Sequence, residues 1–257
     1  MFEIEAIPTL ETNYVWMLTG SGQRAYIVDP GEAQPVLERL QQNQTELAGI
    51  LITHHHWDHT DGLGEILAHT PVPVYGPSSV PEVSNPLEDG DSLVLDEITF
   101  TVMAVPGHTL DHIAYFAPAK TTQAPVLFCG DALFAGGCGR LFEGTPEQAL
   151  HSLKKLTRLP AETQVYCAHE YTLANLRFAR QVEPGNAALA QRLARDEQRL
   201  ASTGTTLPTT MVEELATNPF LRCTQASVKS QMEAHCGGTL TSETEVFAAL
   251  RRWKDVS

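Results

Sequence analysis

The hydrophobic positions in the first two-thirds of the chain fall in short apolar runs that are separated by turn residues, as in Asp29-Pro30-Gly31. This pattern is typical of β-strands, and a few stretches have the wider spacing of amphipathic helices. We expect helices at Pro35–Gln42 and Pro146–Leu156. Strands are expected at Phe2–Ile7, Tyr14–Leu18, Ala25–Val28, Gly49–Ile52, Val72–Tyr75, Ser92–Leu95, Ile98–Val105, Ile113–Phe116, Val126–Cys129 and Val165–Cys167. The pattern predicts a mixed α/β domain with two sets of strands.

From about Leu173 the spacing becomes helical. We expect helices at Leu173–Gln181 and Asn186–Ala201, with Asn186 as an N-cap after the Pro184-Gly185 break. Two further helix starts are marked by the capping-box patterns Thr210-x-x-Glu213 and Ser242-x-x-Glu245. We therefore divide the chain into a mixed domain at 1–172 and a smaller helical domain at 173–257.

Composition is that of an ordinary globular protein, since 42% of the 257 residues are hydrophobic and 19% are charged. Acidic residues stand near the amino terminus where a secretory signal has basic ones, and no apolar run approaches the roughly 18 residues of a membrane span. The five cysteines form no C-x-x-C pair, so neither a disulfide framework nor a thiolate metal site is indicated. We expect a cytoplasmic monomer with reduced cysteines and no membrane partner.

The charge is unevenly distributed. Residues 1–172 hold 7 of the 17 basic and 22 of the 31 acidic residues, a net of −15, whereas residues 173–257 hold 10 and 9, a net of +1. The overall charge of −14 argues against nucleic-acid binding, which needs a basic footprint. If the protein binds a small anion, the carboxy-terminal part is the expected source of the counter-charge.

The segment from Thr53 to His59 contains four histidines and an aspartate directly after an apolar strand. Because side chains alternate along extended backbone, His54 and His56 point to one side, and the following turn can bring Asp58 and His59 to a neighbouring point. The spacing thus suits two adjacent ions, and nitrogen and oxygen ligands suit zinc, iron or manganese. The alternative, a surface histidine tract, fits poorly with an internal cluster that ends a buried strand.

Three more polar residues follow apolar segments that are predicted as strands. They are His108 in Pro106-Gly107-His108-Thr109, Asp131 after Cys129-Gly130, and His169 after Cys167-Ala168. Two of them have an adjacent glycine, as expected where a side chain leaves a sheet edge and points into a shared pocket. Taken alone, each would be read as a structural hydrogen-bonding residue. Together with the histidine cluster they favour metal ligation.

The pattern H-x-H-x-D-H, followed by later single His, Asp and His residues, resembles the metallo-β-lactamase superfamily. Further segments resemble the glyoxalase II (hydroxyacylglutathione hydrolase) family, and the likeness runs essentially end to end: Gly137–Gly144, His169–Thr172, Asn218–Arg222 and Arg251–Asp255. The resemblance implies an αββα sandwich of two mixed sheets, a dinuclear metal site, and a helical carboxy-terminal domain that binds glutathione.

Carried over residue by residue, the resemblance implies that one ion is held by three histidines, the other by an aspartate and two histidines, and that a further aspartate bridges the two. These are His54, His56 and His108 for the first ion, Asp58, His59 and His169 for the second, and Asp131 as the bridge. The expected cofactor is two divalent ions, zinc in the first place, with iron or manganese as alternatives. Asp58 and Asp131 would be catalytic, together with a hydroxide shared by the ions.

For the substrate, the resemblance implies that glutathione contacts Arg140, Phe142, Tyr171, Arg251 and Lys254. Phe142 departs from the tyrosine of some family members, and Arg140 stands where some have lysine. Arg251 and Lys254 are three residues apart, which places them on one face of a helix. A cation near a helix carboxy terminus also complements the helix dipole, so this structural role stays open for both.

The implied reaction is hydrolysis of S-D-lactoylglutathione to glutathione and D-lactate, the second step of methylglyoxal detoxification. Two alternatives remain: a glutathione persulfide dioxygenase with a single iron on the same scaffold, and a non-catalytic metal-binding relative. The complete second ligand set argues against both. We expect Asp29 and Thr53 to orient metal ligands, Cys138 to have a packing role, and the remaining histidines to be non-ligands: His55, His69, His112, His151 and His235.

Overall fold

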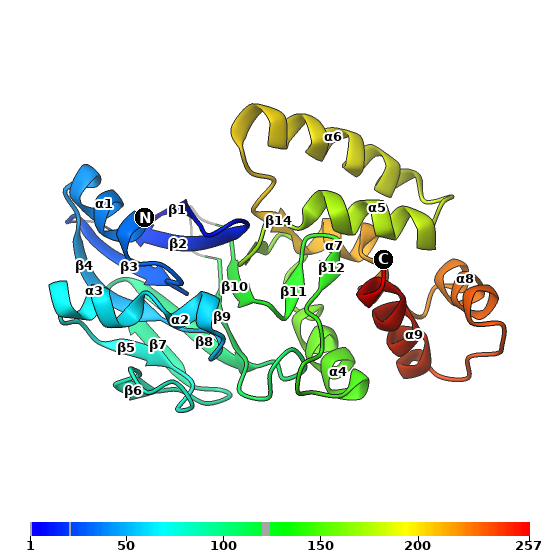
Figure 1. Ribbon diagram of the computed structural model, residues 1–257, viewed down its shortest axis with the longest axis horizontal. Coiled ribbons are helices and arrows are strands. Elements are labelled where there is room, and N and C mark those ends of the chain that lie inside the picture. The colour runs from blue at the N-terminus through cyan, green and yellow to red at the C-terminus, as the bar shows by residue number, and fades with distance from the viewer. Residues whose placement is uncertain (1, 21, 120–123) are drawn as a thin grey trace. The chain divides into compact units, whose positions relative to one another are not determined.

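The computed structural model of the protein describes residues 2–20, 22–119 and 124–257 (Figure 1). The chain forms two compact units. The first comprises Met1–Ala104, Asp111–Gly130 and Tyr166–His169, and the second comprises Val105–Leu110, Asp131–Val165 and Glu170–Ser257. The second unit thus takes the chain from Glu170 onward together with two earlier stretches. The domain boundary that we placed between residues 172 and 173 stays a prediction.

The first sheet of the first unit has the strand order β1-β2-β3-β4-β5-β6. Its strands are β1 (Glu3–Thr9), β2 (Asn13–Thr19), β3 (Arg24–Val28), β4 (Glu46–Leu51), β5 (Val74–Gly76) and β6 (Asn85–Pro86). The first three pair antiparallel, and β3 to β6 pair parallel. Helices α1 (Gln34–Asn43) and α3 (Leu63–His69) lie beside this sheet (Figure 1), and their apolar residues belong to its hydrophobic core. A parallel sheet needs such crossover helices on its face.

The second sheet of the first unit contains β7 (Ser92–Leu95), β8 (Ile98–Ala104), β9 (Ile113–Ala117) and β10 (Val126–Gly130), which pair antiparallel. The end of β13 (Gln164–Cys167) lies beside β10. The two sheets meet through aromatic residues: the Tyr115 hydroxyl donates to the Ile52 carbonyl at 2.6 Å, and the rings of Trp16 and Tyr166 lie edge to face at 4.9 Å. This buried aromatic layer joins the two sheets into a sandwich.

The second unit is mainly helical. Its elements are β11 (Leu133–Phe134), β12 (Gly137–Cys138), α4 (Pro146–Leu156), α5 (Thr172–Val182), α6 (Ala187–Thr203), β14 (Thr209–Thr210), α7 (Met211–Thr217), the 3₁₀ helix η1 (Pro219–Leu221), α8 (Ala226–Cys236) and α9 (Glu243–Asp255). Asn186 caps α6 through a bond from the Leu189 amide, and Ser242 forms a capping box with Glu245, both as predicted. No helix in the described ranges is long and apolar enough to cross a membrane.

The capping box predicted at Thr210 is wrong. Thr210 is the N-cap residue of α7, but its side chain makes no capping hydrogen bond. Strand β14 holds Thr210 extended opposite Gln164, and the Glu213 carboxylate accepts hydrogen bonds from Arg195 at 2.5 Å and from the Thr209 hydroxyl at 3.4 Å. An available guanidinium has displaced the local bond, because a charge-assisted hydrogen bond is the stronger of the two.

Candidate metal centre

The first histidines of the cluster follow the end of β4. The chain bends at Thr53 and, with His56 in an extended conformation, enters the short helix α2 (Trp57–Thr60). Nε2 of His54 and Nδ1 of His56 approach to 3.1 Å, so both rings direct a nitrogen toward one point. His55 points elsewhere and meets the Asp111 carboxylate at 2.9 Å. The alternation predicted from the sequence is therefore seen in the structure, whereas the non-ligand role of His55 stays a prediction.

A second group of ligand atoms gathers around Asp58. One atom each from Asp58, His59 and His169 lie within 4.8 Å of one another. Oδ2 of Asp58 is 3.5 Å from Nε2 of both imidazoles. His169 arrives from the end of β13, where it forms a β-bridge with Asn13 on β2. Two segments that are distant in the sequence thus supply one compact N,N,O donor set.

The outer nitrogens of these rings contact fixed partners. Asp29 is buried and accepts hydrogen bonds at 2.7 Å from both the backbone amide and the hydroxyl of Thr53. The same carboxylate lies 3.1 Å from Nδ1 of His59, and the Thr53 hydroxyl lies 3.0 Å from Nδ1 of His54. Such partners fix the ring orientation and leave Nε2 as the ligand atom. Asp29 and Thr53 occupy the supporting positions that we predicted.

Two further supporting contacts were not predicted. The Thr12 hydroxyl lies 3.1 Å from Nδ1 of His169, and the Asn13 side chain donates to Oδ2 of Asp58 at 3.0 Å and to its carbonyl at 3.2 Å. Thr12 belongs to the turn between β1 and β2, and Asn13 is the first residue of β2. In the sequence they look like ordinary turn residues, and only the β-bridge to His169 brings them to the ligands.

The second unit contains the other two candidate ligands. Nε2 of His108 and Oδ2 of Asp131 are 3.4 Å apart, and Nδ1 of His108 lies 2.7 Å from the Arg140 carbonyl. Gly139 makes this packing possible, since a Cβ there would lie 2.0 Å from the Asp131 carbonyl oxygen and 3.0 Å from Nδ1 of His108. His108 therefore has the same arrangement as the histidines of the first unit, with Nδ1 fixed and Nε2 beside a carboxylate.

The aromatic substrate-binding candidates are accessible. Phe142 is 61% exposed, and its ring lies 5.3 Å from that of His108. Tyr171 is 37% exposed and packs edge to face on Phe134 at 5.2 Å. Exposed aromatic rings beside candidate ligands are suited to contact a bound organic molecule.

The basic candidates differ from one another. Arg251 is only 8% exposed, donates to the Cys138 carbonyl at 2.8 Å and pairs with Asp255 at 3.0 Å. Arg140 is exposed and also pairs with Asp255, at 3.3 Å. Lys254 lies over the Phe178 ring at 5.5 Å, and burial, assisted by the charge of Arg251, lowers the pKa of its ammonium. Arg251 thus has a clear structural role, and the exposed Arg140 also donates to the Asp255 carbonyl at 3.2 Å.

Five of the seven predicted ligands therefore lie in the first unit and two in the second. The donor atoms of each group suit a metal ion, because imidazole nitrogens and carboxylate oxygens converge. The ring nitrogens on the far side are held by other protein groups. The combined set of seven stays a prediction.

Comparison with known proteins identifies the class. The family model described as the metallo-beta-lactamase superfamily matches residues 8–84 and 75–169, and the model described as hydroxyacylglutathione hydrolase C-terminus matches residues 170–257. The paired sheets and the His/Asp clusters are those of a metallo-β-lactamase-fold protein, and they support a dinuclear site for divalent metal ions.

Curated relatives narrow the class to a family. The hydroxyacylglutathione hydrolase of Alkalilimnicola ehrlichii is 53% identical over 100% of both chains, and that of Hahella chejuensis is 48% identical over 99% of both. The corresponding protein of Idiomarina loihiensis is 46% identical over 98% of both. The chain belongs to the hydroxyacylglutathione hydrolase family, as the sequence motifs predicted.

Solved structures share the fold. ETHE1 from Myxococcus xanthus has a TM-score of 0.66 at 24% identity and covers 100% of this chain and 99% of its own. The BLEG-1 B3 metallo-beta-lactamase has a TM-score of 0.64 at 24% identity, with 86% and 99% covered. TTHA1623, solved in a di-iron-bound form, has a TM-score of 0.53 at 29% identity, with 65% and 91% covered. At this level of identity a shared fold does not assign a substrate.

Proposed function

We propose that this protein hydrolyses S-D-lactoylglutathione and related 2-hydroxyacylglutathione thioesters to glutathione and the free hydroxy acid, the second step of methylglyoxal detoxification. The observation that carries this proposal is the full-length likeness to hydroxyacylglutathione hydrolases, at 46–53% identity over 98–100% of each chain. The persulfide dioxygenase alternative is not favoured by these relatives. The complete set of candidate ligands also disfavours a non-catalytic relative.

For the metal site we propose the division made from the sequence. His54, His56 and His108 hold one ion, Asp58, His59 and His169 hold the other, and Asp131 is shared. Mixed nitrogen and oxygen donors without thiolate favour zinc, with iron and manganese as alternatives. The close approach of donor atoms within each unit supports this division.

The residues of the chain prepare the site for attack on a thioester carbonyl. When bound, two divalent ions supply Lewis acidity and lower the pKa of water, which falls to about 7 in favourable zinc sites. Asp29, Thr53 and Asn13 keep the ligands in fixed orientations, so little reorganisation is needed during the reaction. No acyl-enzyme is required. Cys138 is a poor nucleophile, because burial raises the pKa of its thiol despite the nearby Arg251.

Glutathione recognition is assigned to the second unit. We propose that Arg140 and Lys254 attract the carboxylates of the glutathione moiety, while Phe142 and Tyr171 contact its backbone. Arg251 is next to these residues in the proposed glutathione site. Its bonds to Cys138 and Asp255 suggest that it stabilises the structure of this site as well as contributing charge. The positive balance of residues 173–257 is consistent with an anionic substrate.

We further propose a cytoplasmic location and a monomeric state. Glutathione is kept reduced in the cytosol, where its thioesters form and are consumed. Light scattering of the purified protein tests the oligomeric state, and a mass of about twice the 28.1 kDa chain would reject the monomer.

The function is tested with S-D-lactoylglutathione as substrate and simultaneous measurement of thiol, D-lactate and dissolved oxygen. We expect one thiol and one D-lactate per thioester consumed, without oxygen uptake, and loss of activity after chelator treatment. Oxygen uptake with glutathione persulfide, together with no thioester loss, would support the dioxygenase instead.

A further inference from the structure

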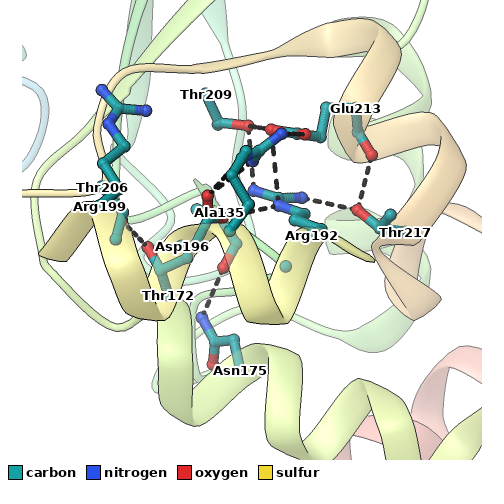
Figure 2. A network of polar contacts seen from close by, with 12 residues as sticks. Ala135, Thr172, Asn175, Arg192, Asp196, Arg199, Thr206, Thr209, Glu213 and Thr217 are labelled. Carbon is teal, nitrogen blue, oxygen red and sulfur yellow. Dashed lines mark hydrogen bonds and ion pairs between the residues drawn. The ribbon is translucent and has the colours of Figure 1, made fainter. Parts of the chain in front are cut away.

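The second unit contains a buried ion-pair network around Arg192, which is only 2% exposed (Figure 2). Arg192 donates to the hydroxyls of Thr217 at 2.6 Å and Thr209 at 3.0 Å. It also donates to Oε1 of Glu214 at 2.6 Å and to Asp196 at 3.3 Å. Burial alone would lower the pKa of this guanidinium, but the adjacent carboxylates outweigh burial and raise it. The arginine is therefore held in its charged form by these partners.

Glu214 connects this network to the β11–β12 hairpin. The residue is 0% exposed, and its two carboxylate oxygens face different groups. Oε1 accepts from Arg192 and from the Thr209 hydroxyl at 2.8 Å, whereas Oε2 accepts from the backbone amide of Gly136 at 2.8 Å and from the Asn218 side chain at 3.0 Å. Both oxygens are thus used, and only one of them belongs to the ion pair.

The turn of the hairpin is held almost entirely by side chains from other elements. Asn218 donates to the carbonyls of Phe134 at 3.3 Å and Gly137 at 2.8 Å. Asn175 of α5 donates to the Ala135 carbonyl at 3.2 Å, a contact drawn in Figure 2. Gly136 has a φ of +71°, a conformation that few other residues adopt without strain. A hairpin with two residues in each strand cannot hold such a turn alone.

This hairpin directly follows one candidate ligand and precedes the backbone that supports another. Asp131 lies two residues before β11, and the segment after β12 supplies Gly139, which contacts Asp131, and the Arg140 carbonyl, which contacts His108. A shift of the hairpin would move Asp131 at one end and the backbone of Gly139 and Arg140 at the other. The side chains of the buried network are therefore hydrogen-bonded to the backbone of the hairpin, and the hairpin adjoins the candidate ligands.

We propose that Glu214 is a positioning residue that fixes Asp131 and His108 through the β11–β12 hairpin. The inference rests on the proposed function, because it assumes that these two residues are metal ligands. The ion pair with Arg192 is made through Oε1 of Glu214. The second oxygen, on the Gly136 amide, is the feature that links the pair to the site.

The test is Glu214→Gln, which keeps the shape of the side chain but turns one acceptor into a donor. Whichever way the amide is oriented, its NH₂ group then faces donors, either those of Arg192 and Thr209 or those of Gly136 and Asn218. The matched control is Glu183→Gln. Glu183 is likewise buried and pairs with an arginine, Arg222, at 2.7 Å, but it bonds the Ser227 and Asn186 side chains and not the hairpin.

Two measurements separate positioning from stability. In the metal-free protein, hydrogen exchange of the peptide containing Gly136 should speed up in Glu214→Gln and not in Glu183→Gln. In the cobalt-loaded protein, Glu214→Gln should show an altered visible spectrum and about 10–100-fold weaker cobalt binding, the usual effect of a lost supporting contact. With thioester substrate, kcat should fall by a similar factor while KM stays within about twofold.

Asn175→Ala is the milder second variant if Glu214→Gln does not fold, and a several-fold weakening of cobalt binding is expected. The proposal is overturned if a folded variant binds cobalt as the wild type does, even with faster hairpin exchange, or if Glu183→Gln weakens binding equally. Cobalt binding does not depend on the substrate. A wild-type protein that binds cobalt but does not hydrolyse the thioester would therefore reject the proposed function and leave this test intact.

Discussion

Two carboxylates, Asp58 in the first unit and Glu214 in the second, have opposite surroundings. Around Asp58 in the first unit, the carboxylate faces two imidazoles, and among the described residues no lysine or arginine pairs with it. Around Glu214 in the second unit, the carboxylate is neutralised by Arg192 and its acceptor sites are filled. A buried acid that is already paired needs no further cation, whereas acids and imidazoles that converge without a protein cation are suited to a metal ion. This contrast separates the site from the scaffold.

The largest effect should come from Asp131→Ala. Hydrolysis should be abolished and the metal content should fall, because the variant removes the ligand proposed to be shared by both ions. Metal analysis and the thioester assay measure this. Asp111→Asn is the control, since Asp111 pairs with the non-ligand His55 and should keep metal and turnover near normal. About two metals per chain and normal turnover in Asp131→Ala would refute the shared role.

His169→Ala should empty or weaken one metal site and leave the other occupied, because Asp58 and His59 keep their places but lose one imidazole. Activity should fall steeply. The spectrum of a cobalt-substituted sample reports which site is lost, and His151→Ala, at an exposed histidine outside the clusters, should match the wild type. Loss of the ion assigned to His54 and His56 would show that the ligands are divided incorrectly.

Lys254→Met should raise KM for the glutathione thioester while changing kcat much less, because contacts distant from the scissile bond act equally in ground and transition states. Arg251→Met should lower kcat as well, since it also removes the bond to the Cys138 carbonyl at the end of the hairpin. A thioester without the glutathione carboxylates serves as the control substrate. Equal losses with both substrates would exclude the charge contact of Lys254.

The same lysine predicts a pH dependence. Its pKa is lowered by burial and by the neighbouring Arg251, so the ammonium loses its charge at a lower pH than an ordinary lysine does. KM should therefore rise as the pH increases toward that lowered pKa, and the rise should be absent in Lys254→Met. A pH profile of KM that is identical in both proteins would assign the effect to another group.

The smallest effect on activity is expected for Glu183→Gln, which changes the scaffold alone. Hydrogen bonds from Arg222 and Ser227 outweigh burial and lower the pKa of Glu183. A lowered folded-state pKa stabilises the fold above the ordinary glutamate pKa of about 4.3, and this contribution is lost as the pH falls through the folded-state value. Urea unfolding should show a loss of roughly 1.5–3 kcal/mol at pH 7 that shrinks in acid, with kcat unchanged. A kcat loss in folded protein would contradict the division between site and scaffold.

Sequence patterns predicted the long elements well, because periodicity and caps are local. Ser92–Leu95 and Pro146–Leu156 match the predicted ranges, and Asn186 caps α6 as expected. The hairpin at Leu133–Cys138 was not predicted, since its turn is held by Glu214, Asn218 and Asn175, which are distant in the sequence. Helices α3 and α8 were also missed; α3 is short, and α8 lacks a side-chain cap.

For the site, the motif spacing gave the candidate ligands and the opposite orientation of His55, because alternation along extended backbone is local. It did not identify Asn13 or Thr12, because their contacts with Asp58 and His169 are tertiary and join residues 45 and 157 positions apart. The motif spacing also did not distinguish the structural role of Arg251 from the role of Lys254. Spacing places both on one helix, but only the tertiary contacts of Arg251 show that it is largely committed to Cys138 and Asp255.

The central claim is that two metal ions act together in thioester hydrolysis, and titration of the metal-free protein with zinc tests it most directly. Bound zinc and the rate of S-D-lactoylglutathione hydrolysis are measured in the same samples after each addition. Full activity should require about two zinc ions per chain, with little activity in singly loaded protein. A rate that reaches its maximum at about one ion per chain and does not change as the second ion binds would contradict the account.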